Sequence, residues 1–338
     1  MNTMKKLSVL ITCYNCKDFI DKAISSVFDQ KIPYEWELLI GDDGSNDGTL
    51  DIIQSWIEKY PNIINLFVMK RDEGAVMSGT RAARNRANLL QNASGEYIAF
   101  LDGDDQLLGD CKFANQISLL DSELYSECAC SAHNIIVNNT QDKTIEPMVK
   151  NMDSIIVVSG LDYWGNMYFH TNTIVFRSIC KEMMLSPQFR DFLNDNFITY
   201  IILQYGSILY LPDCYAQYNI TGNGLWTGKR RAYGCFRNVI LYDLELRINK
   251  DFKNKAFRRH LYDFVYLHRK YKKHDDDVQL LIKELAPNDF PFTFLLEDVD
   301  FNLFKSLKRE VFCLRAEMLS LILRISHIPQ KMIKRRSY

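Results

Sequence analysis

The first 110 residues alternate short runs rich in β-branched and aromatic residues with segments of helical periodicity, and this alternation restricts the fold more than any other feature. Four runs predict strands, at residues 7–13, 36–40, 65–69 and 97–101. The helical patterns between them cover about 19–28, 47–60 and 80–91, and Asp18 is placed to cap the first. Strands that alternate with helices are typical of a mostly parallel sheet covered by helices. We therefore predict an α/β fold.

The regular alternation weakens after residue 110. Irregular stretches separate the further predicted strands, which lie at 128–137, 154–158 and 173–176. From residue 229 the pattern is helical and charged, and Pro287 and Pro291 interrupt it. The sequence therefore predicts one α/β domain over residues 1–228, regular over 1–110 and less regular over 111–228. It also predicts a helical C-terminal region over 229–338.

The formal net charge of −1 is the sum of blocks of opposite sign. Residues 1–110 carry 11 basic and 17 acidic side chains, whereas 229–273 carry 14 and 4, and 305–338 carry 9 and 2. The near-zero total gives no electrostatic footprint for a nucleic acid. In the basic segment 229–273, apolar residues at helical spacing indicate a helix core with basic side chains outside. We therefore expect no nucleic-acid partner.

Composition and cysteine usage indicate the compartment. With 47% hydrophobic residues the chain can fill a sizeable core. No window holds the roughly 18 uninterrupted apolar residues that a membrane span needs, and polar residues interrupt the best candidate, 197–211. The nine cysteines are an odd number, and no apolar signal region precedes the first predicted strand. We therefore expect a reducing cytoplasm.

Carboxylates gather where two of the predicted strands end. Asp42 and Asp43 follow the second strand, and Asp102 and Asp104 follow the fourth, with a glycine between them that permits a tight turn. In open sheets of this class, ligands bind at the carboxyl ends of the strands. Buried carboxylates need a cation to compensate them, and oxygen ligands favour Mg²⁺ or Mn²⁺ together with substrate phosphates. The sequence therefore predicts a metal and diphosphate site at this edge.

Four sequence blocks follow one another in a characteristic order: SVLITCYN at 8–15, GDDGSNDGT at 41–49, GTRAARN at 79–85 and GEYIAFLDGDD at 95–105. Together they resemble the family 2 glycosyltransferases of the GT-A fold. The resemblance implies that 1–228 is a GT-A catalytic domain, with a nucleotide-binding half at 1–110 and an acceptor half at 111–228. It also implies inverting, metal-dependent transfer of a sugar from a nucleotide diphosphate sugar, with a UDP-sugar favoured, to an acceptor hydroxyl.

By this resemblance, the nucleotide base would be held at the ends of the first two strands. Thr12, Tyr14 and Asp43 would contact the base, and Asn15 would lie nearby. A carboxylate at position 43 also suits this role on chemical grounds, because it can accept a hydrogen bond from a base N–H.

The same resemblance assigns the diphosphate and the metal to the third and fourth blocks. Arg84 and Asn85 would lie near the ribose and the diphosphate. Asp102 would border the ribose and the metal, and Asp104 would ligate the metal, which is Mn²⁺ or Mg²⁺. Metal and arginine together would offset the charge that develops on the departing diphosphate.

An inverting transfer needs a general base that takes the proton of the attacking hydroxyl. In the family this residue is commonly the Asp of a Glu-Asp pair at the start of a helix. Asp195 matches this position, although Asn194 stands where the family usually has Glu. Asp191, four residues earlier, is the alternative to Asp195 as the catalytic base.

Residues 218–226 resemble a family segment that closes over donor and acceptor, and the Gln-x-x-Arg-Trp pattern of processive members is absent. The resemblance therefore implies transfer of a single sugar to a glycan or lipid-linked acceptor in surface polysaccharide or glycolipid synthesis. His133 and His170 lie in the same half of the domain. Because lone histidines are more often structural than catalytic, we expect a structural role for both.

Three other functions remain open. A phosphotransferase or phosphatase could use Asp102 as nucleophile and Asp104 as acid, but this class usually has Thr or Val where Gln106 stands. An oxidoreductase with a dinucleotide-binding fold is poorly supported, because no Gly-x-Gly-x-x-Gly follows the first predicted strand. The replacement at Asn194 also leaves open a nucleotide-sugar-binding protein without turnover.

The C-terminal tail combines an amphipathic helical pattern at 314–325 with basic residues at 331–336. A segment of this kind can lie on an anionic membrane leaflet. One interpretation is peripheral docking at the inner face of the cell membrane, close to a lipid-linked acceptor. The other is a helix that packs on the catalytic domain or against the partner in a homodimer.

Overall fold

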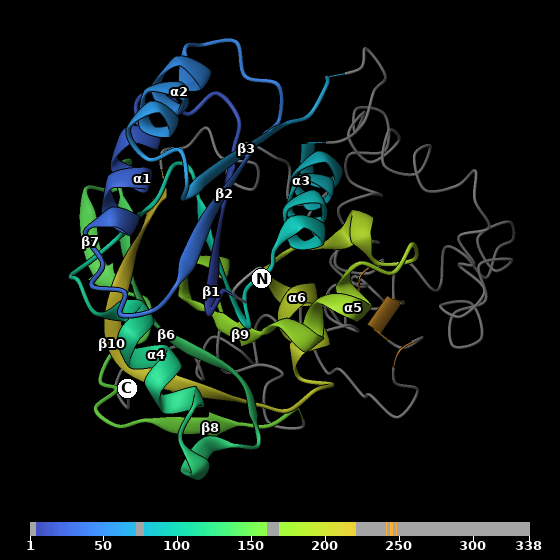
Figure 1. Cartoon of the computed structure of the whole chain (residues 1–338). Coiled ribbons are helices and arrows are strands. Elements are labelled where there is room, and N and C mark those ends of the chain that lie inside the picture. Colours follow the sequence, from blue (N-terminus) through green and yellow to red (C-terminus); the bar gives the residue numbers. More distant parts are fainter. Residues whose placement is uncertain are drawn as a thin grey trace, which may run out of the picture. The chain divides into compact units, whose positions relative to one another are not determined.

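The computed structural model describes residues 5–71, 78–160 and 169–220, together with 241, 244, 245 and 248. The chain divides into two compact units, Met1–Gly74 with Ser78–Gly224, and Ala75–Met77 with Leu225–Tyr338. The fold below is that of the first unit (Figure 1). The predicted helical region over 229–338, with its basic tail, lies outside the described residues except for those four positions.

The first unit is built on a ten-stranded sheet with the order β3-β2-β1-β4-β9-β6-β10-β5, in which β7 also pairs with β6 and β8 with β10. The strands are β1 (Leu7–Cys13), β2 (Trp36–Asp42), β3 (Ile64–Val68), β4 (Tyr97–Asp102), β5 (Gln106–Leu107), β6 (Cys128–Asn139), β7 (Thr144–Pro147), β8 (Ile156–Val158), β9 (Val175–Arg177) and β10 (Ser207–Ile220). The α-helices are α1 (Ile20–Phe28), α2 (Thr49–Lys59), α3 (Ser78–Asn92), α4 (Lys112–Leu120), α5 (Lys181–Met184) and α6 (Asp195–Ile202). The short 3₁₀ helices are η1 (Glu123–Tyr125), η2 (Thr171–Thr173), η3 (Ser178–Cys180) and η4 (Arg190–Phe192).

The strands β1 to β4 form the regular, parallel part of the sheet. β1 lies between β2 and β4, and β3 pairs with the other edge of β2. The register places Thr12 beside both Gly41 and Asp102, so three strand ends meet at one edge. This arrangement confirms the α/β fold and the four strands predicted for residues 1–110.

Apolar side chains on alternate β-strand positions pack under the helices. Leu7, Val9 and Ile11 of β1 belong to one buried core with Ile20 and Ile24 of α1. Figure 1 shows α1 and α2 on one face of this part of the sheet and α3 on the other. The period of two along a strand and of 3.6 along a helix explains why the two patterns meet in one core. No described helix has both the length and the apolar character of a membrane span.

The prediction that Asp18 caps the first helix is wrong. Phe19 precedes α1, and no side chain makes a capping hydrogen bond there. Instead, the backbone N–H groups of Phe19 and Ile20 donate to the Cys16 carbonyl at 2.9 and 2.8 Å. A turn of the preceding chain therefore satisfies donors that a capping side chain would otherwise serve.

The second half of the sheet mixes directions. β9 runs antiparallel to both β4 and β6, whereas the long β10 runs parallel to β6 with several shifts of register. The sequence did not predict β5, β7 or β10. The apolar run 197–211 is divided between α6 and β10, and Gly206 lies at the division. A Cβ on Gly206 would lie 2.5 Å from the Glu127 carbonyl oxygen, so close backbone contact requires glycine here.

Candidate active site

The ends of β1, β2 and β4 bring several of the predicted site residues together. Thr12 of β1 donates from Oγ1 to Oδ1 of Asp102 at the end of β4, at 3.0 Å. The backbone N–H of Asp43 donates to the Cys13 carbonyl at 3.0 Å, which ties the chain after β2 to the end of β1. The residues predicted to hold the base and those predicted to hold the metal therefore share one edge of the sheet.

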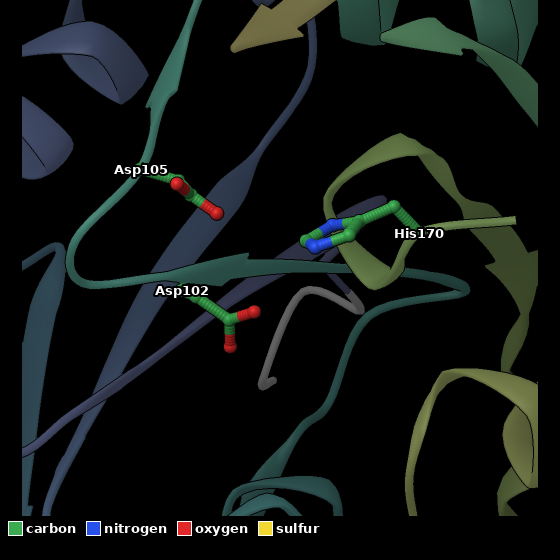
Figure 2. Close-up of side chains that lie close together, drawn as sticks. All are labelled: Asp102, Asp105 and His170. Carbon is green, nitrogen blue, oxygen red and sulfur yellow. The ribbon is translucent and has the colours of Figure 1, made fainter. Parts of the chain in front are cut away.

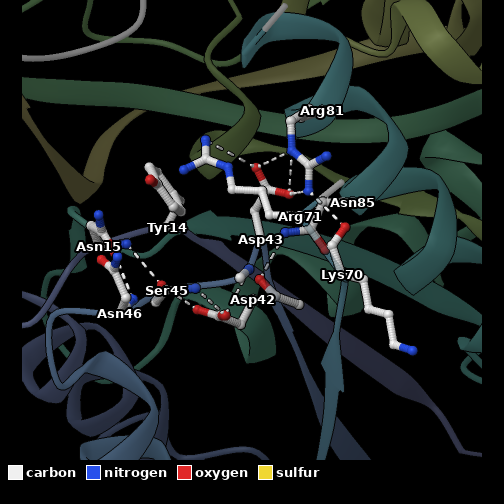
Figure 3. A network of polar contacts seen from close by, with 12 residues as sticks. Tyr14, Asn15, Asp42, Asp43, Ser45, Asn46, Lys70, Arg71, Arg81 and Asn85 are labelled. Carbon is white, nitrogen blue, oxygen red and sulfur yellow. Dashed lines mark hydrogen bonds and ion pairs between the residues drawn. The ribbon is translucent and has the colours of Figure 1, made fainter. Parts of the chain in front are cut away.

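One group of side chains includes two residues predicted to hold the nucleotide base, and we therefore call it the base cluster. It consists of Tyr14, Asp43, Arg71 and Arg81 (Figure 3). The Arg81 Nε donates to both Asp43 carboxylate oxygens, at 2.8 and 2.9 Å, and both side chains are buried. Arg71 lies 3.9 Å from the same carboxylate, and its guanidinium carbon lies 3.6 Å from the centre of the Tyr14 ring. Two cations thus compensate Asp43, and Tyr14 presents an aromatic face to a flat, delocalised group.

Asn15 joins the loops after β1 and β2 rather than facing the base cluster. Its backbone adopts a positive φ of 50°, which Asn tolerates better than most residues. Its N–H donates to the Ser45 hydroxyl at 2.8 Å, and its side-chain oxygen accepts from the Asn46 N–H at 3.1 Å. Buried Asp42 accepts from the Ser45 N–H at 2.8 Å and holds the same loop. Asn15 therefore shapes the loop beside the predicted base site.

Arg84 and Asn85 of α3 point in different directions. The Arg84 guanidinium forms a two-point ion pair with Asp191 of η4, at 2.8 and 3.1 Å. Asn85 is buried and donates from Nδ2 to the Gly41 carbonyl at 2.8 Å. In this structure, Asn85 supports the end of β2 and Arg84 supports η4. Their predicted contacts with ribose and diphosphate stay predictions.

Asp102, Asp104 and Asp105 follow one another at the end of β4, and we call them the carboxylate cluster. Asp102 accepts from Nη2 of Arg86 at 2.9 Å as well as from Thr12. Burial opposes its ionisation, yet its pKa is lowered because Arg86, His170 and the hydrogen bonds together outweigh that penalty. Asp102 is therefore the member of the cluster whose charge the protein itself compensates.

Among the described residues, Asp104 and Asp105 form no ion pair of this kind. Burial and the neighbouring Asp102 raise the pKa of Asp104 to about 6, because they outweigh the opposing influence of His170 and Arg86. Burial and the other two carboxylates raise the pKa of Asp105 well above its usual value, although it accepts hydrogen bonds from the Asn219 N–H at 2.7 Å and from the Asn172 amide at 2.5 Å. Asn219 also donates to the Asp104 carbonyl at 2.9 Å. Three adjacent carboxylates with one paired arginine form a site that a cation would stabilise.

His170 approaches the cluster from the segment before η2 (Figure 2). One ligand atom each of Asp102, Asp105 and His170 lie within 4.8 Å of one another, a grouping that could hold a metal ion. The expectation of a structural role for His170 stays a prediction, and this grouping also makes His170 a candidate ligand. Carboxylate and imidazole donors fit Mn²⁺, and the uncompensated Asp104 and Asp105 fit any divalent cation. Asp104, predicted to ligate directly, is not in that group of three, so its role as a ligand stays a prediction.

Asp195 begins α6, and Asn194 precedes it as a capping residue. The Asn194 side chain accepts from the Phe197 N–H at 3.0 Å, which gives the unusual Asn a structural function. Burial and four carboxylates, Asp105, Asp195, Asp104 and Asp102 in that order, raise the pKa of Tyr218 to about 12. Asp195 and the carboxylate cluster are therefore both close enough to Tyr218 to influence its pKa. Asp191, by contrast, is paired with Arg84.

Four residues that organise these groups had no predicted role, namely Arg81, Arg86, Lys112 and Asn172. A signal for Arg81 exists, because Arg81, Asn85 and Leu89 follow at intervals of four residues on the buried stripe of α3. For Asn172 the signal is absent, since it lies in an irregular turn whose partners are about 70 residues away in the sequence.

The model of the family "Glycosyl transferase family 2" matches residues 8–184, which are more than half of the chain. Two similar proteins are also named as glycosyltransferases. TuaG of Bacillus subtilis (strain 168), provisionally named a teichuronic acid biosynthesis glycosyltransferase, is 27% identical over 239 residues, which cover 69% of this chain and 88% of TuaG. The GalNAc(5)-diNAcBac-PP-undecaprenol beta-1,3-glucosyltransferase of Campylobacter jejuni is 24% identical over 255 residues, which cover 73% of this chain and 77% of that enzyme.

Two solved structures share the fold. S. aureus TarS 1–349 in complex with UDP-GlcNAc superposes with a TM-score of 0.56 at 20% identity, covering 84% of this chain and 80% of TarS. The mannosyltransferase PcManGT from Pyrobaculum calidifontis, in complex with GDP-Man and Mn²⁺, superposes with a TM-score of 0.53 at 16% identity, covering 96% and 87%. These likenesses confirm the predicted GT-A fold. From the family match and this fold, we conclude that the chain is a glycosyltransferase and belongs to glycosyl transferase family 2.

Proposed function

We propose that this enzyme transfers one sugar, with inversion at the anomeric carbon, from a UDP-sugar to a hydroxyl group of a glycan or lipid-linked acceptor. The observation that carries the proposal is the meeting of the base cluster and the carboxylate cluster at one sheet edge, where Thr12 donates to Asp102. The names of the two relatives, which concern teichuronic acid and an undecaprenol-linked glycan, support a role in surface polysaccharide or glycolipid synthesis.

The base cluster suits the nucleoside part of the donor. Tyr14 is 38% exposed, and Arg71 covers its ring face. A bound base would take the place of this guanidinium, because both are flat groups that stack on an aromatic ring. Asp43, held by Arg81, would then accept from the base N–H. TarS and PcManGT are named with different donors, UDP-GlcNAc and GDP-Man, so the identity of the base needs a direct test.

The carboxylate cluster suits Mn²⁺ or Mg²⁺, which Asp102 and Asp104 would hold together with the donor diphosphate. A bound ion supplies positive charge beside the departing nucleotide diphosphate. Arg86 adds a second positive charge, because it already pairs with Asp102 at 2.9 Å. The complex of PcManGT with GDP-Man and Mn²⁺ supports this cofactor.

For the general base we propose Asp195 rather than Asp191. Both carboxylate oxygens of Asp191 accept hydrogen bonds from the Arg84 guanidinium, whereas Asp195 begins α6 and lies near Tyr218 and the carboxylate cluster. Asp195→Asn should lower kcat by about two to four orders of magnitude while donor binding stays intact. Asp191→Asn is the matched control. Near-normal turnover in Asp195→Asn would contradict the assignment.

Thermal unfolding with UDP, GDP, dTDP and CDP, each with and without Mn²⁺, tests the proposal as a whole. We expect one diphosphate, UDP, to stabilise the protein in a metal-dependent manner, because ligands that bind the folded state raise its stability. Turnover of the matching nucleotide sugar then separates an enzyme from a binding protein without activity. Absence of stabilisation by all four diphosphates would contradict the proposal.

We also propose that the protein works in the cytoplasm, at the inner face of the cell membrane. The support is chemical: the basic residues at 331–336 suit an anionic leaflet, and a lipid-linked acceptor would lie there. Deletion of 326–338 should weaken binding to vesicles that contain anionic lipid. Unchanged binding would favour the other interpretation, in which the tail packs on the domain or against the partner in a homodimer. Sedimentation of the intact and the shortened protein would show whether the tail supports a dimer.

A further inference from the structure

Lys112 and Gln116 of α4 hold the turn η2 from its buried side. The Lys112 Nζ donates to the Asn172 carbonyl at 2.7 Å, and the Gln116 Nε2 donates to the Thr173 carbonyl at 3.0 Å. The two side chains are one helical turn apart, and both are fully buried. α4 therefore fixes two successive carbonyl groups of η2.

The side chain of Asn172 connects this turn to the carboxylate cluster. Its Oδ1 accepts from the Asp102 N–H at 2.9 Å, and its Nδ2 donates to an Asp105 carboxylate oxygen at 2.5 Å. The Asn172 N–H lies 3.3 Å from Nδ1 of His170, so the same turn also positions the histidine. Any rotation of η2 would consequently move Asn172 and His170 relative to both carboxylates.

A lysine is a costly residue for this position. Lys112 has no exposed surface, and in the described part of the chain its amino group donates to one acceptor, the Asn172 carbonyl. Burial lowers its pKa to about 7, which reflects the cost of keeping the charge there. A methionine of similar length would fill the space without that penalty. The one thing a methionine cannot provide is the hydrogen bond to η2.

We propose that Lys112 is a positioning residue for the metal site: by fixing the Asn172 carbonyl, it orients the amide that links Asp102 to Asp105. Gln116 assists by holding the next carbonyl. This inference rests on the proposed function, because it requires that the carboxylate cluster binds a divalent cation. Groups that orient metal ligands without touching the metal typically change its affinity by about 10- to 100-fold.

The test is the affinity of the full-length protein for Mn²⁺, measured with UDP present from the electron paramagnetic resonance signal of free Mn²⁺. Lys112→Met should weaken Mn²⁺ binding by about tenfold. Ile117→Val is the matched control, since it removes a buried methylene from the same helix without touching η2, and it should change the affinity less than twofold. Should Lys112→Met fail to fold, Gln116→Met removes the other α4 donor and should weaken binding in the same direction.

The outcomes distinguish failure of the positioning role of Lys112 from failure of the proposed metal function. Equal Mn²⁺ affinities in folded Lys112→Met and the unaltered protein would overturn the positioning role and leave the proposed function intact. Equal weakening in Ile117→Val would also overturn it, because the effect would then follow from loosening α4. If the unaltered protein bound no Mn²⁺ with any nucleoside diphosphate, the metal function of the cluster would fail, and this inference with it.

Discussion

The base cluster and the carboxylate cluster lie at the same sheet edge but treat their charges differently. In the base cluster, Asp43 is buried with Arg81 and approached by Arg71. In the carboxylate cluster, Arg86 is the one ion-pair partner among the described residues, and it serves Asp102. The pKa values of Asp104 and Asp105 are raised accordingly. The described residues thus compensate the Asp43 carboxylate directly, whereas the raised pKa values of Asp104 and Asp105 are what a cation at the proposed metal site would offset.

Stability and function should therefore respond in opposite ways to charge removal at the two clusters. Removing a charge from the base cluster leaves its buried partner unpaired and should destabilise the fold. Removing a charge from the carboxylate cluster relieves repulsion, yet it removes a group that the proposed reaction needs. Strain or uncompensated charge of this kind is commonly concentrated at functional sites.

The largest expected effect is the loss of activity in Asp104→Asn. We expect kcat to fall by about a thousandfold, equivalent to about 4 kcal/mol, because the cluster loses a charge that holds the cation. The metal-free protein should keep or gain stability, since repulsion with Asp102 is relieved. Donor turnover and unfolding in the presence of a chelator measure the two effects. Near-normal turnover of Asp104→Asn would contradict the proposed role of the carboxylate cluster in the reaction.

The second effect is a loss of stability in Arg81→Met. This change leaves the buried Asp43 carboxylate without its two-point partner, which should cost about 3 kcal/mol of unfolding free energy. Urea unfolding measures it. The double variant with Asp43→Leu removes both charges and should recover much of the loss. If Arg81→Met were as stable as the unaltered protein, Arg81 would not be the residue that compensates the buried Asp43 carboxylate.

The parallel half could be predicted from sequence because its signals are local. Each strand of β1 to β4 is a short apolar run, and each helix repeats at the spacing of one face, so the strand ends and their carboxylates follow directly. Asp42, Asp43 and Asp102 were found in this way. The GT-A fold and the enzyme class were also accessible, through four motifs whose order is more specific than any one of them.

The partners of these carboxylates could not be predicted, because pairing is a long-range property. Asp43 and Arg81 are 38 residues apart, and Lys112 and Asn172 are 60 apart. Lys112 looks like an ordinary surface residue at a helix start, and only its position one turn before Gln116, beside a buried apolar stripe, hints otherwise. The strands β5, β7 and β10 were missed because short or bulged strands carry weak periodicity.

A third, smaller effect concerns packing behind the base cluster. A Cβ on Gly41 would lie 2.1 Å from Oδ1 of Asn85, a buried side chain that hydrogen-bonds to the Gly41 carbonyl. Gly41→Ala should therefore cost about 2 kcal/mol in thermal or urea unfolding. Gly160→Ala is the control, since its Cβ would make ordinary contacts at 3.8 Å and should change stability by less than about 0.5 kcal/mol. Equal stability of the two variants would show that Asn85 is free to move.

The smallest effect is a pH dependence that comes from Lys112. Its pKa is lowered to about 7 by burial, from 10.5. Between these values the unfolded chain binds a proton that the folded protein has released, so stability rises with pH. From pH 7 to 8 the metal-free protein should gain about 1 kcal/mol relative to Lys112→Met, in which this group is absent. Urea unfolding of both proteins at each pH measures the difference, and other titrating groups cancel in it.

The difference in stability between the unaltered protein and Lys112→Met could also stay constant from pH 7 to 8. That result would bear on the contrast between the base cluster and the carboxylate cluster. It would mean that Lys112 keeps its proton above pH 7, which requires nearby negative charge to stabilise the ammonium. Two groups are candidates for this charge: the buried Cys130 thiol, which favours the charged form of Lys112, and the carboxylate cluster, which hydrogen bonds through Asn172 connect to Lys112. The second case is the one that concerns the two clusters. The cluster would then be partly compensated from within, and the predicted gain in stability of Asp104→Asn should shrink with it. A rise of the expected size would mean that Lys112 contributes no charge to the cluster above pH 7, so that Asp104 and Asp105 would depend on a bound cation for compensation.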